Sequence, residues 1–112
     1  MTDLLTFAAN FAHSLVNGDS ESAHKMLSND LRNKLTVKEL VTQLGVLADD
    51  MGGITGTGEP MVILEEWPDM SASDRAMIYV PLEGDVYSEA VTVTVSEADN
   101  GLTISGIEWG RP

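Results

Sequence analysis

Apolar residues recur at steps of three and four in the first half of the chain and at steps of two in the second half. The first group forms one helical stripe, made of Leu4, Phe7, Ala8, Phe11, Ala12 and Leu15. We expect this helix to end at Asn17-Gly18, because both residues tolerate the left-handed conformation of a helix C-cap. Asp19 or Ser20 can then cap a second helix, whose apolar face comprises Ala23, Met26, Leu27 and Leu31.

A third helix is predicted from its start signal. Thr36 and Glu39 have the spacing of a capping box, in which each side chain accepts a hydrogen bond from the other residue's backbone N–H. This helix should run over residues 37–50 and stop at Gly52-Gly53, since glycine is common just after a helix. The glycine-rich residues 52–60 are interpreted as a flexible linker.

After the linker the alternation of apolar and polar residues is typical of strands. Four strands are predicted, over residues 61–67, 76–82, 89–97 and 102–109. Three helices followed by strands in succession indicate the α+β class, with the helices packed on one face of a curved antiparallel sheet of about four strands.

The last two predicted strands form a hairpin. Asn100-Gly101 is the pair that type I′ turns prefer, and it sets Glu97 opposite Ile104. Past Gly106 the apolar residues change parity, so we infer a β-bulge at Ser105-Gly106. One extra residue there returns Ile107 and Trp109 to the inner face.

Composition narrows the classes of function. At 112 residues, 1–112 is expected to be a single domain. The absence of cysteine excludes a thiol nucleophile and a thiolate metal site. No apolar run reaches membrane-spanning length and no basic signal-peptide start is present, so a soluble cytoplasmic protein is expected.

The charge is strongly acidic and unevenly distributed. Six basic residues oppose 18 acidic ones, giving a net charge of −12. This charge argues against nucleic acid and anionic membrane as partners, because proteins bind both with Lys and Arg. No Lys or Arg occurs between Lys38 and Arg75. The acidic stretch serves solubility, or it forms a face for a basic protein or a cationic ligand.

Taken together, the chain resembles the nuclear transport factor 2-like superfamily. The resemblance is carried by Leu15-Val16-Asn17-Gly18-Asp19, then Ala23 and Met26-Leu27, the long third helix, and the terminal Ile107-Glu108-Trp109. It implies a cystatin-like cone, in which a curved sheet wraps around helices. The superfamily includes isomerases, dehydratases, hydrolases and SnoaL-like cyclases as well as non-catalytic binding domains. Its sheets often pair through the outer face, which implies a possible homodimer with Ala90, Thr92 and Thr94 in the contact.

A catalytic member of such a family would need a titratable group inside the cone. Glu65 and Glu66 are adjacent, so in a strand they point to opposite faces. An inward Glu65 beside Trp67 would have a raised pKa and could act as a general base. The alternative is an edge-strand charge that prevents sheets from pairing.

Further candidates for ligand contact are weaker. His24 flanks the apolar face of the second helix, and the phenol of Tyr79 could hydrogen-bond a ligand. Trp109 is expected to pack in the core, and the alternative is that it lines a cavity as a ligand platform. No spacing of His, Asp or Glu matches a metal site, and no cofactor motif is present.

We therefore expect a non-enzymatic domain that binds a small ligand or a protein partner. One alternative is a small lyase, isomerase or hydrolase of the same superfamily, with catalytic residues unknown. The other is an acidic inhibitor or immunity-type protein that neutralises a basic effector by charge complementarity.

Overall fold

A computed structural model describes residues 2–98 and 101–110 and shows an α+β chain. Its elements, in chain order, are α1 (Thr2–Val16), α2 (Ser20–Lys25), α3 (Asn29–Lys34), α4 (Val37–Met51), β1 (Ile54–Thr57), β2 (Met61–Leu64), β3 (Asp74–Gly84), β4 (Glu89–Ala98) and β5 (Gly101–Trp109). The predicted α+β class is confirmed, while the cystatin-like cone stays a prediction.

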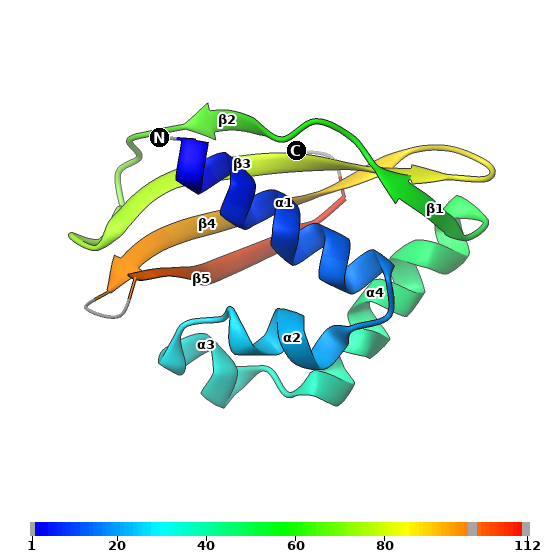
Figure 1. The fold of residues 1–112 in the computed structure, drawn as a ribbon, viewed down its shortest axis with the longest axis horizontal. Helices are drawn as coiled ribbons and strands as arrows, with labels where there is room; N and C mark the ends of the chain where they lie inside the picture. The colour runs from blue at the N-terminus through cyan, green and yellow to red at the C-terminus, as the bar shows by residue number, and fades with distance from the viewer. Residues whose placement is uncertain (1, 99–100, 111–112) are drawn as a thin grey trace.

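The strands form one antiparallel sheet with α1 lying across it (Figure 1). The order is β1-β3-β4-β5, and β2 pairs with β3 on the same side as β1. One edge of the sheet is therefore built from two short strands in tandem. At the other edge, the segment that joins α2 to α3 lies beside β5, where Leu27 forms a parallel bridge with Ile104.

The first helix ends as predicted. Gly18 adopts φ +81°, the left-handed conformation that the Asn17-Gly18 stop signal requires. Asp19 then caps α2 by accepting a hydrogen bond from the Ser22 backbone N–H. The polar break between the first two apolar stripes is thus a C-cap followed directly by an N-cap.

The prediction of one second helix is wrong, because two short helices occupy its place. Ser28 caps α3 by accepting a hydrogen bond from the Leu31 backbone N–H, so the chain restarts there instead of continuing from α2. Between the helices, Met26 and Ser28 exchange backbone hydrogen bonds with Ile104, each 2.8 Å long. Pairing with β5 satisfies backbone groups that a continuous helix would have satisfied internally.

The capping box of α4 is confirmed. The Thr36 hydroxyl accepts from the Glu39 N–H at 3.1 Å, and the Glu39 carboxylate accepts from the Thr36 N–H at 2.9 Å. The backbone hydrogen bond, and then the contact with the hydroxyl, lower the pKa of Glu39. The ionised Glu39 carboxylate therefore contributes fully to stability above its ordinary pKa. That contribution is lost as the pH falls through the lowered pKa.

Replacing Thr36 with alanine should lower the free energy of unfolding by about 0.5–2 kcal/mol, because a backbone donor at the helix start loses its acceptor. Urea denaturation at pH 7 measures this change. A midpoint equal to that of the unaltered protein would show that the cap does not hold the helix start.

Two predictions about the first strands need correction. Residues 52–60 are not all linker, since Ile54 pairs with Gly84 and Thr57 with Leu82 to form β1. The strand predicted over 61–67 is shorter, because β2 ends at Leu64. Pro68 follows soon after, and proline has no backbone N–H with which to extend a ladder.

The final hairpin is bulged as predicted, but its register differs by two residues, so the side chains keep their predicted faces. Gly101 pairs with Ala98, so Glu97 opposes Leu102 and not Ile104. The predicted turn residue Asn100 lies outside the described residues. The bulge at Ser105 is confirmed, because Val95 pairs with Ile104 and Thr94 with Gly106. Beyond it, Ile107 and Trp109 pair with Val93 and Val91, on the predicted inner face.

Candidate functional site

The inner face of the sheet is filled by side chains. On the helix side of this face, α1 contributes Phe11, which is 0% exposed, and Leu15, which is 1% exposed. From the sheet, the fully buried residues at 0–1% exposure are Ala76, Ile78, Val80, Leu82, Val91, Val93, Val95 and Ile104. These residues form one continuous apolar cluster with Leu40 and Met51 of α4. The face on which the sequence analysis placed a ligand cavity is occupied by the protein's own core.

Glu65 and Trp67 do not form a carboxylate–aromatic pair inside a cavity. Both Glu65 and Glu66 are exposed, because the chain leaves the ladder after Leu64 and no longer alternates between sheet faces. Trp67 is half-buried and lines a polar pocket on the surface. The alternation that assigned Glu65 an inward position does not apply beyond the strand's end.

The other candidates lie on different elements and have structural partners. His24 is half-buried, and its Nε2 lies 2.7 Å from the carbonyl oxygen of Leu35, which ties α2 to the start of α4. Tyr79 is half-buried on the outer face of β3, opposite Met61. The structure thus does not bring His24 and Tyr79 into one site with Glu65.

Trp109 is half-buried at the end of β5 and packs against the core cluster. Its indole Nε1–H donates a 2.6 Å hydrogen bond to Gln43 Oε1 of α4. Together they border a shallow apolar groove of about 260 Å³, lined also by Val46, Leu47 and Asp50. The tryptophan therefore joins α4 to the sheet at the surface, between the two roles expected from the sequence.

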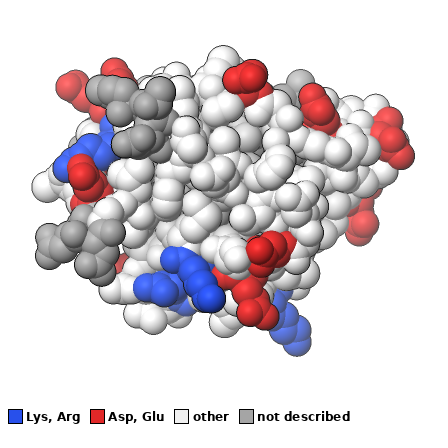
Figure 2. All heavy atoms as spheres, in the orientation of Figure 1, with Lys and Arg blue, Asp and Glu red and all other residues white. Residues whose placement is uncertain are grey.

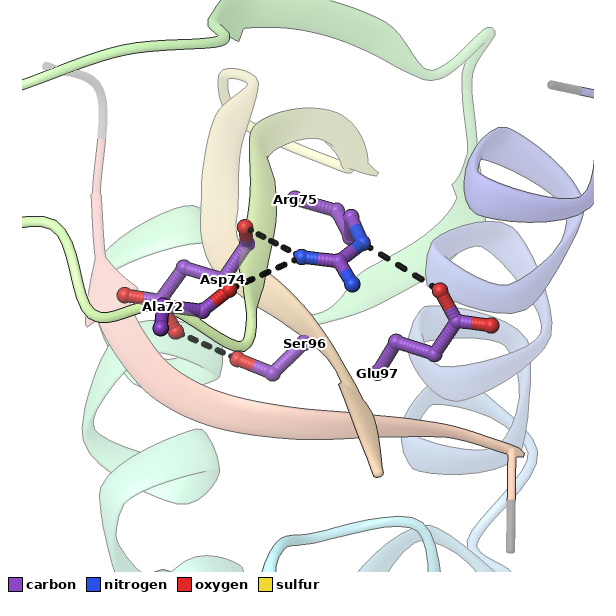
Figure 3. A network of polar contacts seen from close by, with 5 residues as sticks. All are labelled: Ala72, Asp74, Arg75, Ser96 and Glu97. Atoms are coloured by element: carbon purple, nitrogen blue, oxygen red, sulfur yellow. Dashed lines mark hydrogen bonds and ion pairs between the residues drawn. The ribbon is translucent and has the colours of Figure 1, made fainter. Parts of the chain in front are cut away.

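A polar pocket of about 410 Å³ surrounds Asp74, where β3 begins. Figure 3 shows the polar contacts of Asp74 and Arg75 with Ala72, Ser96 and Glu97. Its Oδ1 accepts hydrogen bonds from Ser96 Oγ at 2.5 Å and Ser105 Oγ at 3.3 Å, and its Oδ2 accepts from the Ser71 N–H at 3.0 Å. Next to it Arg75 donates to Glu97 at 3.2 Å. Ser105, the bulge residue of β5, supplies the second hydroxyl that donates to this carboxylate.

The hydrogen bonds in this pocket fit a structural role and not a catalytic one. Ser96 is 4% exposed, and its hydroxyl is hydrogen-bonded to Asp74 and Ser105 without a histidine to take its proton. A serine nucleophile needs such a base to be activated. The network joins β3, β4 and β5 at one end of the sheet. Its role is therefore structural, because it holds the turn before β3 in place.

The edge strand β2 exposes apolar side chains that do not take part in the core. All four residues of β2 are large, apolar and exposed: Met61 at 53%, Val62 at 42%, Ile63 at 37% and Leu64 at 43%. We call these four side chains the β2 surface. Single exposed apolar residues are ordinary, but four in succession on an edge strand mark a docking site or an aggregation hazard.

Carboxylates flank the β2 surface at both ends. Glu59 precedes it, and Glu65, Glu66 and Asp69 follow it, all four exposed. We call these four residues the acidic flank. Because no Lys or Arg lies between Lys38 and Arg75, this flank has no basic residue of its own segment to neutralise it. On the face shown in Figure 2, basic side chains gather along the lower and left margins, whereas acidic ones are widespread.

The sequence showed the acidic stretch but not the exposure of the strand beside it. Exposure of Met61–Leu64 depends on β2 taking an edge position, and the edge position depends on its pairing with β3 alone. The signal available was the run Met-Val-Ile-Leu, which lacks polar alternation and is typical of a strand covered on both faces.

Comparison with known proteins found no matching family model, curated protein or solved structure. In the described residues, no helix has both the length and the apolar character needed to cross a membrane. Over the same residues, His, Asp and Glu side chains form no group of three that could hold a metal ion.

Proposed function

We propose that this chain is a non-enzymatic domain that binds a basic protein partner through the β2 surface. The observation that carries the proposal is the run of four exposed apolar side chains on an edge strand, set between exposed carboxylates. Protein interfaces have this arrangement, with an apolar centre that excludes water and a polar rim that remains solvated. The acidic flank supplies a rim of one sign, which attracts and orients a partner of the opposite sign.

The filled core supports binding over catalysis. Acid–base catalysis by the fold that the chain resembles requires a titratable group in a water-excluding cavity. The inner face instead holds Phe11 and a layer of valines, all fully buried. The same filling argues against a small ligand within the sheet.

The homodimer implied by the resemblance stays a prediction. Ala90 and Thr92, two of its expected contact residues, are 0% and 5% exposed in the single chain and add little area to a contact. Two copies would also each bring a net charge of −12 to the interface. A basic partner removes that repulsion.

Substituting Met61 with glutamate should abolish partner capture, because the charge would have to be desolvated at the centre of the interface. The immobilised protein, exposed to extract of its own host cells, is expected to retain basic proteins that the variant does not retain. Val46→Glu is the matched control, since Val46 is 62% exposed on α4, which lies away from β2 (Figure 1). If the variant and the control retain the same proteins as the unaltered chain, the proposed function is contradicted.

A further inference from the structure

The β2 surface continues onto the outer face of the sheet. Ladder partners place their side chains on the same face of a sheet. Met61 pairs with Tyr79 and Leu64 with Met77, so these four residues form one apolar strip across β2 and β3. Met61 and Leu64 are exposed, while Met77 and Tyr79 are half-buried. We call these four residues the methionine strip.

Two methionines give this strip an adaptable shape. Methionine is unbranched and has a polarizable thioether, so it fits partners of irregular shape better than β-branched residues do. Surfaces that combine methionine with flexible packing accept a class of apolar side chains without a fixed pocket. The partner is therefore expected to present bulky apolar residues such as Leu, Phe or Trp.

A strand is a poor occupant of this edge. Edge pairing draws its affinity from main-chain hydrogen bonds, and β2 offers only the four residues Met61–Leu64. The register shifts between Val62 and Leu64, so the extra residue Ile63 interrupts even this short ladder. Pro60, just before β2, has no N–H to donate. Bulges and prolines are devices that prevent strands from adding to an edge.

A helix needs none of these backbone groups. Its own N–H and C=O groups are paired internally, so it can dock through side chains alone. The opposite face of this sheet already packs a helix, α1, whose Ala8 and Phe11 are fully buried. The outer face has the same twist and strand spacing to receive another.

A second copy of this chain is a poor occupant too. Two-fold symmetry pairs edge strands antiparallel, and an axis at the middle of β2 would set Glu59 of one copy beside Glu66 of the other. Like charges in facing positions destabilise such a pair. The acidic flank favours lysine or arginine in the partner instead.

We infer that the occupant of the methionine strip is a basic amphipathic helix, with its apolar side on the strip and its Lys or Arg side chains against the acidic flank. This inference rests on the proposed function and names the partner's chemistry. The charges determine attraction and orientation, while the apolar contact determines affinity.

Two synthetic peptides of equal composition test the shape of the partner. One repeats the heptad Leu-Lys-Lys-Leu-Leu-Lys-Leu and forms an amphipathic helix, whereas the other repeats Leu-Lys-Leu-Lys-Leu-Lys-Leu and favours a strand. Binding to the intact protein is measured by calorimetry and by the methyl resonances of Met61 and Met77. The helical peptide is expected to bind about tenfold more tightly and to shift both methyl signals. It is also expected to bind about tenfold more weakly in roughly 0.5 M salt, where charges are screened.

Met61→Glu distinguishes docking from attraction by net charge alone. It adds a negative charge, so an interaction driven only by charge would strengthen. Docking on the strip should instead weaken by about tenfold, the loss expected when an apolar contact is replaced by a charge at a buried position. Leu64→Glu provides a second variant of the strip, and Val46→Glu should leave the affinity unchanged or slightly raised.

The outcomes separate this inference from the proposed function. Tighter binding of the alternating peptide, still weakened by Met61→Glu, would overturn the helical partner and leave the β2 surface as the binding site. Affinity that rises in Met61→Glu and Leu64→Glu would overturn the strip as the docking site. If these variants also retain the same host proteins as the unaltered chain, the proposed function is contradicted as well.

Discussion

Replacing Phe11 with alanine is expected to lower the free energy of unfolding by about 3–5 kcal/mol, the usual cost of truncating a buried aromatic residue. Phe11 is 0% exposed and extends from α1 into the inner face of the sheet. Chemical denaturation followed at equilibrium gives the value. Because small domains have total stabilities of roughly 5–15 kcal/mol, this loss would remove a substantial share of the stability of the fold.

The size of this loss distinguishes a core from a binding cavity. An aromatic residue that lined an empty ligand site would have few packing partners, and its truncation would cost little. A loss below about 1 kcal/mol for Phe11→Ala would therefore contradict the filled inner face. Val41→Ala is a useful comparison, because Val41 is exposed on α4 and its truncation should change stability by less than about 0.5 kcal/mol.

Gly84→Ala is expected to destabilise the protein by about 1–3 kcal/mol or more, the cost of forcing atoms into a packed site. A Cβ at Gly84 would lie 2.6 Å from the carbonyl oxygen of Tyr87 and 2.8 Å from that of Gly53. Both are backbone atoms, so relief requires movement of the turn after β3 or of the link before β1. Thermal unfolding measures the effect.

Gly45→Ala is the matched control and should have the opposite sign. Gly45 lies within α4, where a Cβ meets nothing within 4 Å. Alanine there should stabilise the helix by about 0.5–1 kcal/mol, because glycine loses more backbone entropy on folding. If Gly84→Ala proves as mild as Gly45→Ala, the close approach of Gly53 and Tyr87 to β3 is wrong.

Local signals predicted the elements whose boundaries are set by their own residues. The capping box of Thr36 and Glu39 satisfies two backbone donors within a single turn, so no distant contact decides where α4 begins. The bulge at Ser105 followed from a change of parity, because both inner faces of the hairpin must remain apolar. In each case the deciding atoms are close in sequence.

Elements decided by distant contacts were not predictable in this way. Residues 54–57 include the β-branched Ile54, Thr55 and Thr57, but the glycines within and around them favoured a linker. They become β1 because β3 extends to Gly84 and offers them a ladder. The helix predicted after Asp19 divides at residues 26–28 because β5, some 75 residues away, accepts that segment as a neighbour. Propensity carries no information about such partners, and tertiary context overrides it.

The candidate site had the same limitation. Glu65, Trp67 and His24 were predictable as candidates because titratable and aromatic residue types are recognisable in a sequence. The proposed binding surface consists of Met61, Val62, Ile63 and Leu64. This run of residues is equally typical of a buried strand. Only the sheet order shows that this strand lies at an edge.

The central question is whether a partner covers the β2 surface in the cell. A photo-reactive amino acid placed at position 63, with position 46 as the matched site on α4, records which proteins lie against each surface after irradiation of living host cells. We expect a cross-link from position 63 to a basic protein, joined within a helical segment, and no such product from position 46. A position 63 that cross-links only to a second copy of this chain, or to nothing, would contradict this expectation.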